Sequence, residues 1–274
     1  ISNKGGKIKF KEAKKILNLA EKSNIELIDT AISYGESEKI IGDVGITNFK
    51  IVSKLPDLPK GYINVDEWVE ENVKSSIKRL RINSLYGLLI HKTENLLGDN
   101  GKKLINSLNR IKNDGLVKKI GISIYDPSEC EKIFNIMKVD IVQAPLNIMD
   151  RRLIVSGWLS KLNSQKVEIH TRSVFLQGLL LMSRNSIPSY FNRWSKIWDR
   201  WFYEIKKNNL SPTEVCLSFI FSLPEIDHII VGVDNAYQLK DIIKKSKSKI
   251  AQIDWSFMHS NDQMLINPSN WHKL

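Results

Sequence analysis

The chain has 274 residues, with 41 Lys or Arg against 30 Asp or Glu and 42% hydrophobic residues. This length fits one α/β barrel or one large doubly wound domain, and it allows a sizeable core. The basic excess is spread along helix-like segments, which is typical of a solvated surface rather than a phosphate-reading face, although it would favour an anionic small molecule.

The two cysteines and the hydropathy pattern indicate the compartment. Cys130 and Cys216 each lie among apolar residues, lack C-x-x-C spacing and are too few for a disulfide framework. No apolar run reaches the roughly eighteen residues of a membrane span. Residues 1–4 carry no apolar core like that of a signal peptide. We therefore expect a cytoplasmic protein without a membrane partner.

Helical and strand-like segments alternate along the chain. Residues 11–22 are predicted to be helical because apolar side chains recur there at helical spacing. Short apolar runs rich in β-branched residues predict seven strands, at residues 25–31, 50–55, 85–91, 119–124, 141–146, 167–174 and 228–233. Spacing and capping residues predict helices between them, at residues 36–42, 66–79 and 101–114, after Asp126 and after Ser211.

Seven buried-type strands separated by helices are the pattern of one parallel sheet, in a single domain over residues 1–274. The first visible element is a helix and the chain does not start with Met. We therefore expect an α/β fold of the (β/α)8 TIM barrel type, whose first strand lies upstream of Ile1 or is missing. The alternative is an open doubly wound sheet, but the Gly-x-Gly-x-x-Gly expected after its first strand is not found in the chain.

Two segments fall outside the alternation. Residues 183–209 interleave aromatic side chains with Arg and Lys. This predicts a loop and helix that pack on the barrel or wall a pocket, with base stacking in a nucleic-acid binder as the weaker alternative. Residues 251–274 carry Trp255, Trp271 and a turn-forming Asn-Pro-Ser-Asn stretch. We expect this tail to close over one end of the barrel.

Polar side chains end three consecutive predicted strands. Asp29, Lys54 and His91 stand at these strand ends, and Tyr34 follows Asp29 after one short turn. Because the carboxyl ends of parallel barrel strands converge on one face, these four side chains are predicted to lie close together at that end of the barrel. Taken singly, each has an ordinary structural explanation, such as a helix cap or a satisfied core histidine. Together, their order and spacing form a long and specific pattern.

With these residues the sequence resembles the aldo-keto reductase family, whose members are (β/α)8 barrels that lack a Rossmann motif and reduce aldehydes and ketones with a nicotinamide cofactor. The order Asp29, Tyr34, Lys54, His91 is similar to the catalytic tetrad of that family. Further similarity runs through nearly all of the chain. It is nearest to bacterial members that accompany surface-polysaccharide or nonulosonate-type sugar biosynthesis. The resemblance thus implies carbohydrate metabolism and a small carbonyl or alcohol substrate derived from a sugar.

Elementary chemistry gives each tetrad residue a role. A carbonyl that accepts hydride develops alkoxide charge, so the phenol of Tyr34 is the expected general acid. A cation such as Lys54 would lower the pKa of that phenol and make it useful near neutral pH. Asp29 would pair with Lys54 and fix its position. His91 would donate a hydrogen bond to the substrate oxygen.

The resemblance also implies cofactor contacts. Ser123 and Gln143 match positions that hold the nicotinamide carboxamide, with Asn147 a weaker candidate. Ordinary strand-end hydrogen bonding is the other explanation for them. Residues 232–238 resemble the loop and helix start where backbone N–H groups receive the adenosine phosphate. The candidates there are Gly232, Asp234, Asn235 and Gln238, and a simple helix cap by Asn235 is compatible with this role.

Two departures from the family pattern concern the cofactor. Many members stack a tyrosine under the nicotinamide, whereas this chain has Arg172 ahead of Ser173, so the stacking group is either this guanidinium or Phe175. Members that prefer NADP often carry a basic or hydroxyl side chain for the 2′-phosphate. Asp234 would instead repel that phosphate and accept from a ribose hydroxyl. The family therefore favours NADP(H), Asp234 favours NAD(H), and no metal is predicted.

Three functions compete on these grounds. The leading one is an NAD(P)(H)-dependent oxidoreductase that reduces an aldehyde or ketone with Tyr34 as general acid. The second is a non-catalytic nucleotide-binding or regulatory protein of the same fold, against which the complete tetrad argues. The third is nucleic-acid binding, suggested only by the basic balance and the Trp-rich segment, and no nucleic-acid partner is expected.

Overall fold

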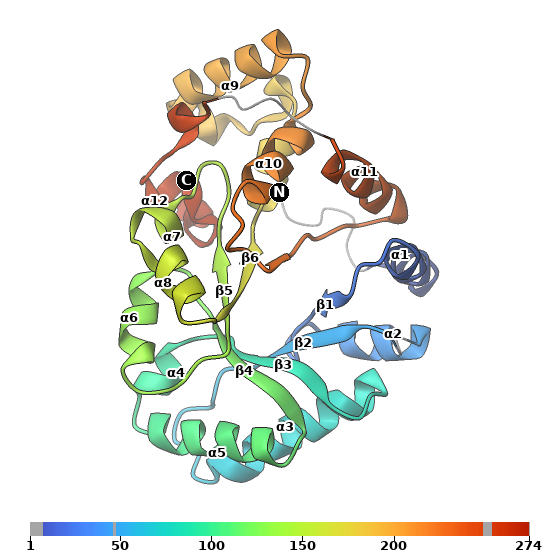
Figure 1. Ribbon diagram of the computed structural model, residues 1–274, viewed down its shortest axis with the longest axis vertical. Coiled ribbons are helices and arrows are strands. Elements are labelled where there is room, and N and C mark those ends of the chain that lie inside the picture. The colour runs from blue at the N-terminus through green and yellow to red at the C-terminus, as the bar shows by residue number, and fades with distance from the viewer. Residues whose placement is uncertain (1–7, 46–47, 249–253, 274) are drawn as a thin grey trace.

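A computed structural model describes residues 8–45, 48–248 and 254–273. Its centre is a seven-stranded, all-parallel sheet (Figure 1). The strands are β1 (Leu27–Asp29), β2 (Lys50–Leu55), β3 (Leu85–Ile90), β4 (Val117–Ser123), β5 (Ile141–Pro145), β6 (Glu168–Arg172) and β7 (His228–Ile229). Two expectations concern parts of the chain outside the described residues: a first strand upstream of Ile1, and the lack of a signal peptide at residues 1–4.

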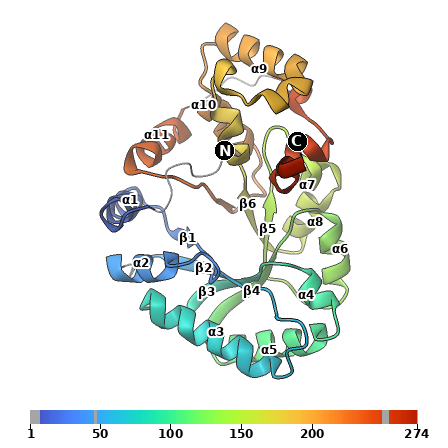
Figure 2. The same ribbon diagram turned by 180° about the vertical axis from the view of Figure 1, so that it is seen from behind.

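Helices cover the outer side of the sheet, as the two opposite views in Figures 1 and 2 show. The α-helices are α1 (Phe10–Lys22), α2 (Ser37–Val44), α3 (Val65–Leu80), α4 (Glu94–Leu97), α5 (Gly101–Asn113), α6 (Ser128–Phe134), α7 (Arg152–Val155), α8 (Trp158–Ser164), α9 (Ser195–Lys207), α10 (Pro212–Phe221), α11 (Ala236–Ser246) and α12 (Gln263–Ile266). Short 3-10 helices are η1 (Leu176–Leu181), η2 (Arg184–Ser186), η3 (Ser189–Trp194), η4 (Ser256–Met258) and η5 (Pro268–Lys273).

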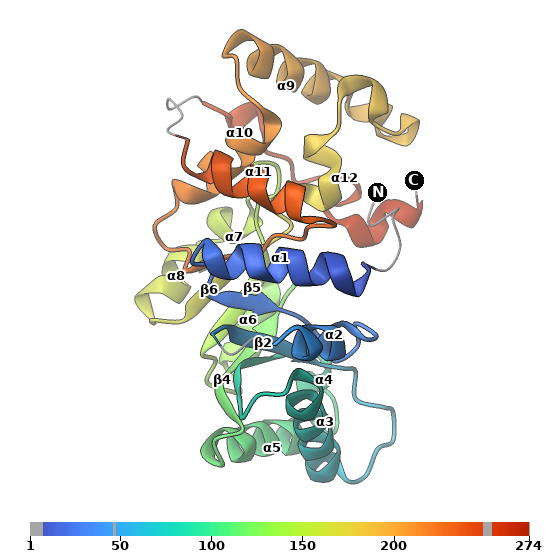
Figure 3. The ribbon, with the colours of Figure 1, turned by 90° about the vertical axis from the view of Figure 1, so that its right-hand side faces the viewer.

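The strand order identifies the fold class. The strands follow one another in the sheet as they do in the sequence, from β1 to β7, and the sheet curls with its helices outside (Figure 1). A doubly wound sheet would instead reverse its order at a switch point, so the predicted barrel class is correct. Within the described residues β1 and β7 are not paired with each other. On that side α1 and α11 lie next to each other (Figure 3).

All seven predicted strands are present, but the outermost ones are shorter than expected. β1 covers only part of residues 25–31, and β7 covers only the first two residues of 228–233. Each pairs with a neighbour on one side alone, so fewer of its residues enter a hydrogen-bonded ladder. The apolar composition of a segment predicts that it is buried, but it does not predict whether the strand pairs on one side or on both. The lengths of the two outermost strands were therefore overestimated.

The inside of the curled sheet is filled by aliphatic side chains. Val52, Leu89 and Ile141 meet there from three strands and are fully buried. Gly121 lets β4 approach β5, because a Cβ atom at this position would lie 2.3 Å from the carbonyl oxygen of Ile141. The barrel interior at this level is therefore a packed core, as is usual for the fold.

Both helix starts predicted from capping residues are present, with side-chain contacts to backbone N–H groups. Glu129, in the first turn of α6, accepts the N–H groups of Tyr125 and Asp126. Ser211 and Glu214 form a reciprocal capping box at the start of α10. Only the start of α10 is thus a full capping box; at α6 the Glu129 side chain binds N–H groups ahead of the helix, and the residue at the N-cap position makes no side-chain hydrogen bond to it.

The aromatic segment at residues 183–209 folds into η2, η3 and α9. The indoles of Trp198 and Trp201 are fully buried, and Trp198 Nε1 donates to the carbonyl of Phe191 at 3.2 Å. The packing interpretation of this segment is therefore confirmed, and these rings are not available for base stacking. The tail joins the same layer, since the ring of Trp271 meets Phe191 edge-on at 5.0 Å. Residues 251–253 and 274 of the predicted tail lie outside the described residues.

Both cysteines are free and buried. Burial raises the pKa of the Cys130 thiol to about 12 and that of Cys216 further still, so neither is a reactive thiolate. Among the helices that the structure describes, none combines the length and apolar content of a membrane span.

Candidate active site

The carboxyl ends of the strands open into a cavity of about 950 Å³. It extends from the ends of β1 to β6 to the loop between β7 and α11. Of the predicted site residues, Asn235 and the weaker candidate Asn147 do not line it; those that do are Asp29, Tyr34, Lys54, His91, Ser123, Gln143, Arg172, Ser173, Gly232, Asp234 and Gln238. One volume therefore joins the predicted proton-transfer groups to the predicted nucleotide loop.

Asp29 and Lys54 form a buried ion pair at the mouth of the barrel. Asp29 ends β1 and Lys54 lies near the end of the adjacent β2. The Lys54 ammonium donates to Asp29 Oδ2 at 2.6 Å and to the carbonyl of Thr30 at 2.9 Å. Burial lowers the pKa of the Lys54 ammonium, and the Asp29 carboxylate opposes this shift. The pair holds the ammonium in one place, as expected from the sequence.

Tyr34 stands on a tight turn between β1 and α2. Its N–H donates to the carbonyl of Ala31, and its own carbonyl accepts from Ser37, the first residue of α2. Gly35 has a φ of 57°, which only glycine adopts without steric cost. The turn therefore fixes the phenol close to the strand end that carries Asp29.

Helix α2 is anchored below this turn by a buried glutamate. Glu38 is 1% exposed, and its Oε1 accepts hydrogen bonds from the hydroxyls of Ser53 and Ser76. Gly42 follows one turn later, where a Cβ atom would lie 2.2 Å from the carbonyl oxygen of Arg79. These contacts seat α2 directly against β2 and α3, and so position the start of the helix that follows Tyr34.

The phenol of Tyr34 is half exposed and faces two other site residues. Its ring lies 6.0 Å from that of His91, and Lys54 Nζ lies 5.4 Å from its centre. Burial, together with the Asp29 carboxylate, raises the pKa of Tyr34, and the cation that opposes this is Arg172. The sequence predicted a pKa lowered by Lys54. That prediction is wrong for the free protein, because burial and the Asp29 carboxylate both disfavour the phenolate.

His91 follows β3 and shares the cavity with Tyr34. Burial, and then the charge of Lys54, lower the pKa of its imidazole. The neutral ring therefore prevails at neutral pH, and it can donate through one nitrogen only.

Ser123 ends β4 and lies beside Gln143, in the middle of β5, and both are buried. Gln143 Nε2 donates to Asp29 Oδ1 at 2.7 Å, so its amide is oriented by the ion pair and its carbonyl oxygen remains for a ligand. Asn147 is different. It donates to the carbonyl of Ser173 and accepts from the N–H groups of Met149 and Asp150, and it does not line the cavity. Its role is therefore to hold a loop.

Arg172 projects from the end of β6 into the cavity. Its guanidinium lies 4.6 Å from the centre of the Tyr125 ring and donates to the carbonyl of Ile124 at 2.9 Å. Among the described residues it has no carboxylate partner within ion-pair distance, and burial lowers its pKa. Ser173, the next residue, has a φ of 61°, a strained backbone that turns the chain away from the strand. Arg172 thus presents an unpaired charge to the cavity.

In the loop after β7 and at the start of α11, three backbone N–H groups already have side-chain partners. Asn235 caps α11 by accepting the N–H of Gln238, and Gln238 in turn accepts the N–H of Asp234 at 2.7 Å. The N–H of Ala236, at the first position of α11, donates to Glu12 of α1 at 2.9 Å. Three N–H groups of the loop and helix start that were expected to receive a phosphate are therefore already bound to side-chain oxygens.

Two aromatic residues of the cavity were not among the predicted site residues. Tyr125 lies two residues beyond Ser123 and is 44% exposed in the cavity wall. Its position just after a strand end was a signal that the sequence offered. Trp271 reaches the cavity from the tail, and its place there depends on packing against Phe191, which the sequence does not reveal.

Comparisons with known proteins agree on one family. The profile of the Aldo/keto reductase family matches residues 1–261. An uncharacterized oxidoreductase of Bacillus subtilis, YqkF, is 24% identical over 260 residues, which cover 87% of this chain and 83% of that protein.

Two solved structures have a similar fold. The aldo-keto reductase AKR11C1 of Bacillus halodurans in its holo form superposes with a TM-score of 0.73 at 16% identity, over 92% of this chain and 87% of that one. The glycerol dehydrogenase AKR11B4 of Gluconobacter oxydans superposes with a TM-score of 0.71 at 18% identity, over 94% and 86%.

Proposed function

Because the chain belongs to the aldo/keto reductase family, we propose that it reduces a carbonyl substrate with Tyr34 as the general acid. The chain is an oxidoreductase, and enzymes of this family use NAD(P)H. The observation that carries the proposal is that Tyr34, His91 and the Asp29–Lys54 pair face one cavity that also reaches the loop before α11.

A bound nicotinamide would supply the hydride. The residues of the chain handle the proton and the charge. The raised pKa keeps Tyr34 protonated at neutral pH, so it can give its proton to the alkoxide that develops on the substrate. His91, held neutral, donates a hydrogen bond to the same oxygen. After proton transfer the Arg172 guanidinium, the cation that lowers the pKa of this phenol, would favour the phenolate.

The wall of the cavity has groups that fit a nicotinamide nucleotide. The free carbonyl oxygen of Gln143 is placed to accept from a carboxamide, and Ser123 offers a hydroxyl beside it. Gly232 faces open space, since a Cβ atom there would meet nothing within 4 Å. We assign Arg172 to the nicotinamide face, where its charge would favour the neutral reduced ring over the cationic oxidised one.

The adenosine end favours NADH over NADPH. A 2′-phosphate at the loop before α11 would meet the carboxylates of Asp234 and Glu12 and would find the N–H of Ala236 already bound. A ribose hydroxyl would instead find an acceptor in Asp234. The cofactor assigned here is therefore NAD(H).

The substrate proposed is a sugar-derived carbonyl compound, as in the polysaccharide-associated branch that the sequence resembles. The similar fold of a glycerol dehydrogenase is compatible with a polyol or sugar skeleton. The unpaired charge of Arg172 suits a substrate that also bears an anionic group. We place the reaction in the cytoplasm because both cysteines are free.

The test is oxidation of NADH and NADPH by the purified protein with a panel of sugar aldehydes and ketones, in matched neutral and carboxylated forms. Turnover of any member at a rate above the nucleotide background supports a reductase. Tight nucleotide binding, followed by fluorescence, without turnover of any member would favour the non-catalytic alternative instead.

A further inference from the structure

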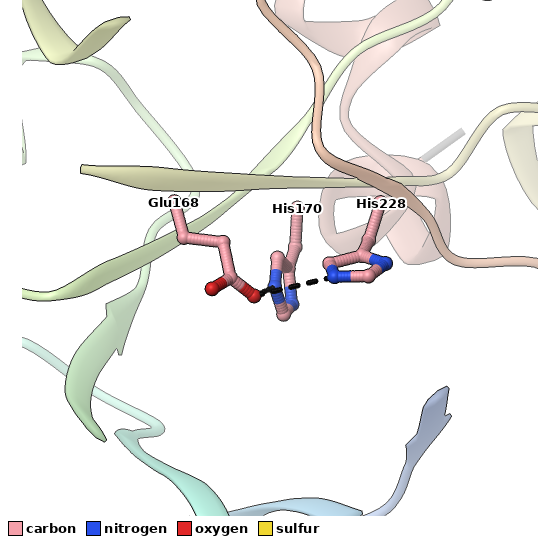
Figure 4. A group of neighbouring side chains, drawn as sticks. All are labelled: Glu168, His170 and His228. Atoms are coloured by element: carbon pink, nitrogen blue, oxygen red, sulfur yellow. Dashed lines mark hydrogen bonds and ion pairs between the residues drawn. The ribbon is translucent and has the colours of Figure 1, made fainter. Parts of the chain in front are cut away.

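A polar cluster lies at the opposite end of the sheet, where β6 and β7 begin, and the proposed reaction does not use it. Glu168 is the first residue of β6, His170 follows on the same strand, and His228 is the first residue of β7 (Figure 4). Barrel interiors are usually filled by branched aliphatic side chains. A glutamate whose side chain is only 10% exposed, beside two histidines, therefore requires an explanation.

Strand geometry brings the three side chains together. Residues two apart on a strand face the same side, so Glu168 and His170 project together, and the register of the sheet sets His170 opposite His228. Glu168 Oε1 lies 2.6 Å from His170 Nε2 and 3.3 Å from His228 Nε2. One donor atom from each residue can be chosen so that all three lie within 4.8 Å of one another.

The second oxygen of Glu168 is fixed by residues of two further strands. Tyr86 of β3 donates to Oε2 at 2.8 Å, and Lys119 of β4 forms an ion pair with the same oxygen. Metal-binding carboxylates are commonly oriented by hydrogen bonds of this kind. The carboxylate is therefore held with Oε1 turned toward the two imidazoles.

Burial of the cluster is uneven. His170 is fully buried, and its Nδ1 has no hydrogen-bond partner among the described residues, so the ring makes its polar contacts through Nε2 alone. The side chain of His228 is 27% exposed and leaves one side of the cluster open to solvent. An ion could enter from this side and keep a water molecule there.

We propose that Glu168, His170 and His228 form a binding site for a first-row divalent metal ion of the Zn²⁺ type. Two imidazoles and one carboxylate, with a fourth position open to water, are donors that Zn²⁺ accepts in tetrahedral geometry. Metal–ligand bonds of about 2.0 Å place tetrahedral donor atoms roughly 3.3 Å apart. The contact of 2.6 Å must widen and the contact of 3.3 Å already fits. The sequence predicted no metal, and the two histidines lie far apart in the chain.

The expected role of the ion is structural. β7 has two residues, lies at the end of the sheet and pairs with β6 alone. An ion bound to both strands would tie β7 to the sheet at its first residue. The charge of Lys119, in contact with Glu168, opposes a cation at Oε1 and should weaken its affinity.

The decisive experiment is titration of the chelator-treated protein with Co²⁺, whose visible absorption reports tetrahedral nitrogen and oxygen ligands, followed by displacement with Zn²⁺. A single site is expected, and His228→Gln should weaken it by about tenfold or more. His272→Gln changes an exposed histidine outside the cluster and is the matched control, which should leave binding unchanged. Absence of a Co²⁺ spectrum, or equal loss in both variants, would overturn the proposal.

A second variant separates a metal site from a purely hydrogen-bonded cluster. Lys119→Met removes the competing cation, so a metal site predicts tighter Co²⁺ binding. Zn²⁺ at about a hundredfold excess over its dissociation constant should raise the thermal unfolding midpoint of the wild-type protein and of Lys119→Met by about 5 °C. The His228→Gln variant should show no such rise. If the unfolding midpoint of neither the wild-type protein nor Lys119→Met responds to Zn²⁺, the ion is excluded and the cluster serves only to pair Lys119.

Discussion

Glu38 and Arg79 are joined by two hydrogen bonds, in which Nε and Nη2 of the guanidinium donate to Oε2 of the carboxylate at 2.9 and 2.6 Å. The carboxylate is buried, whereas the guanidinium is 35% exposed. Oε1 of the same carboxylate accepts from the hydroxyls of Ser53 and Ser76, so each oxygen of Glu38 accepts two hydrogen bonds. This pair fixes the helix that follows the Tyr34 turn.

Replacing Glu38 by alanine should therefore destabilise the protein strongly. The change leaves two buried hydroxyls and part of a guanidinium without partners, and the loss of one member of a buried pair costs about 3 kcal/mol. Urea unfolding should show a lower midpoint with an unchanged slope. Glu71→Ala, in an exposed position of α3, is the control and should change the free energy of unfolding little. A small effect at Glu38 would mean that the two serines and Arg79 find water instead.

The general-acid role of Tyr34 is tested by Tyr34→Phe. Loss of a positioned proton donor should lower kcat by about 10²- to 10⁴-fold while the dissociation constant of NADH stays close to that of the wild type. Tyr125→Phe removes another phenolic hydroxyl from the same cavity wall and should keep most of the activity. Comparable kcat values for Tyr34→Phe and the wild-type protein would rule out the proposed acid.

The pH dependence of reduction should report the groups around Tyr34. The acid must be protonated, and its pKa is raised, so activity should persist on the alkaline side until the pH exceeds the usual tyrosine value of about 10. Arg172 lowers this pKa, so Arg172→Leu should move the alkaline limb of kcat/KM to still higher pH. A limb that moves to lower pH in this variant would show that a different group titrates.

His91 sets the acidic side of the same profile. Its pKa is lowered by burial and by Lys54, so the imidazole stays neutral down to a pH below about 6.5. We expect no inflection between neutrality and that value. An inflection near pH 7 that disappears in His91→Gln would show that the imidazolium forms more readily than its surroundings suggest.

Cofactor choice depends on two carboxylates. Asp234→Ser and Glu12→Gln each remove negative charge from the proposed 2′ position, so each should tighten NADPH binding more than NADH binding, and the double variant should add the two effects. Fluorescence titration of both nucleotides measures this directly. Glu21→Gln, in the last turns of α1 and away from Ala236, is the charge-matched control. An unchanged NADPH affinity in the double variant would place the 2′ group elsewhere.

The sequence predicted the elements that depend on local composition. Buried β-branched runs located all seven strands, and the order of polar residues at their ends located the cavity, because barrel topology brings strand ends together whatever the details of packing. The helix starts at α6 and α10 followed from short-range capping, which is also readable from adjacent residues.

What depends on distant partners was not predictable in the same way. The direction of the Tyr34 pKa shift follows first from burial of the phenol and then from the charge of the Asp29 carboxylate, and both depend on how the strand ends pack together. The contact of Glu12 with Ala236 crosses nearly the whole chain. Neither residue type nor spacing carries that information.

The sequential order of the sheet also has a consequence for synthesis. Each strand pairs with the one that leaves the ribosome just before it, so the nascent chain can add βα units one at a time without waiting for distant segments. The bond between Glu12 and Ala236 joins residues 224 positions apart, and it forms only after α11 has been made. The loop proposed to hold the nucleotide is thus among the last parts to be completed, and a nascent chain is not expected to bind the cofactor before release.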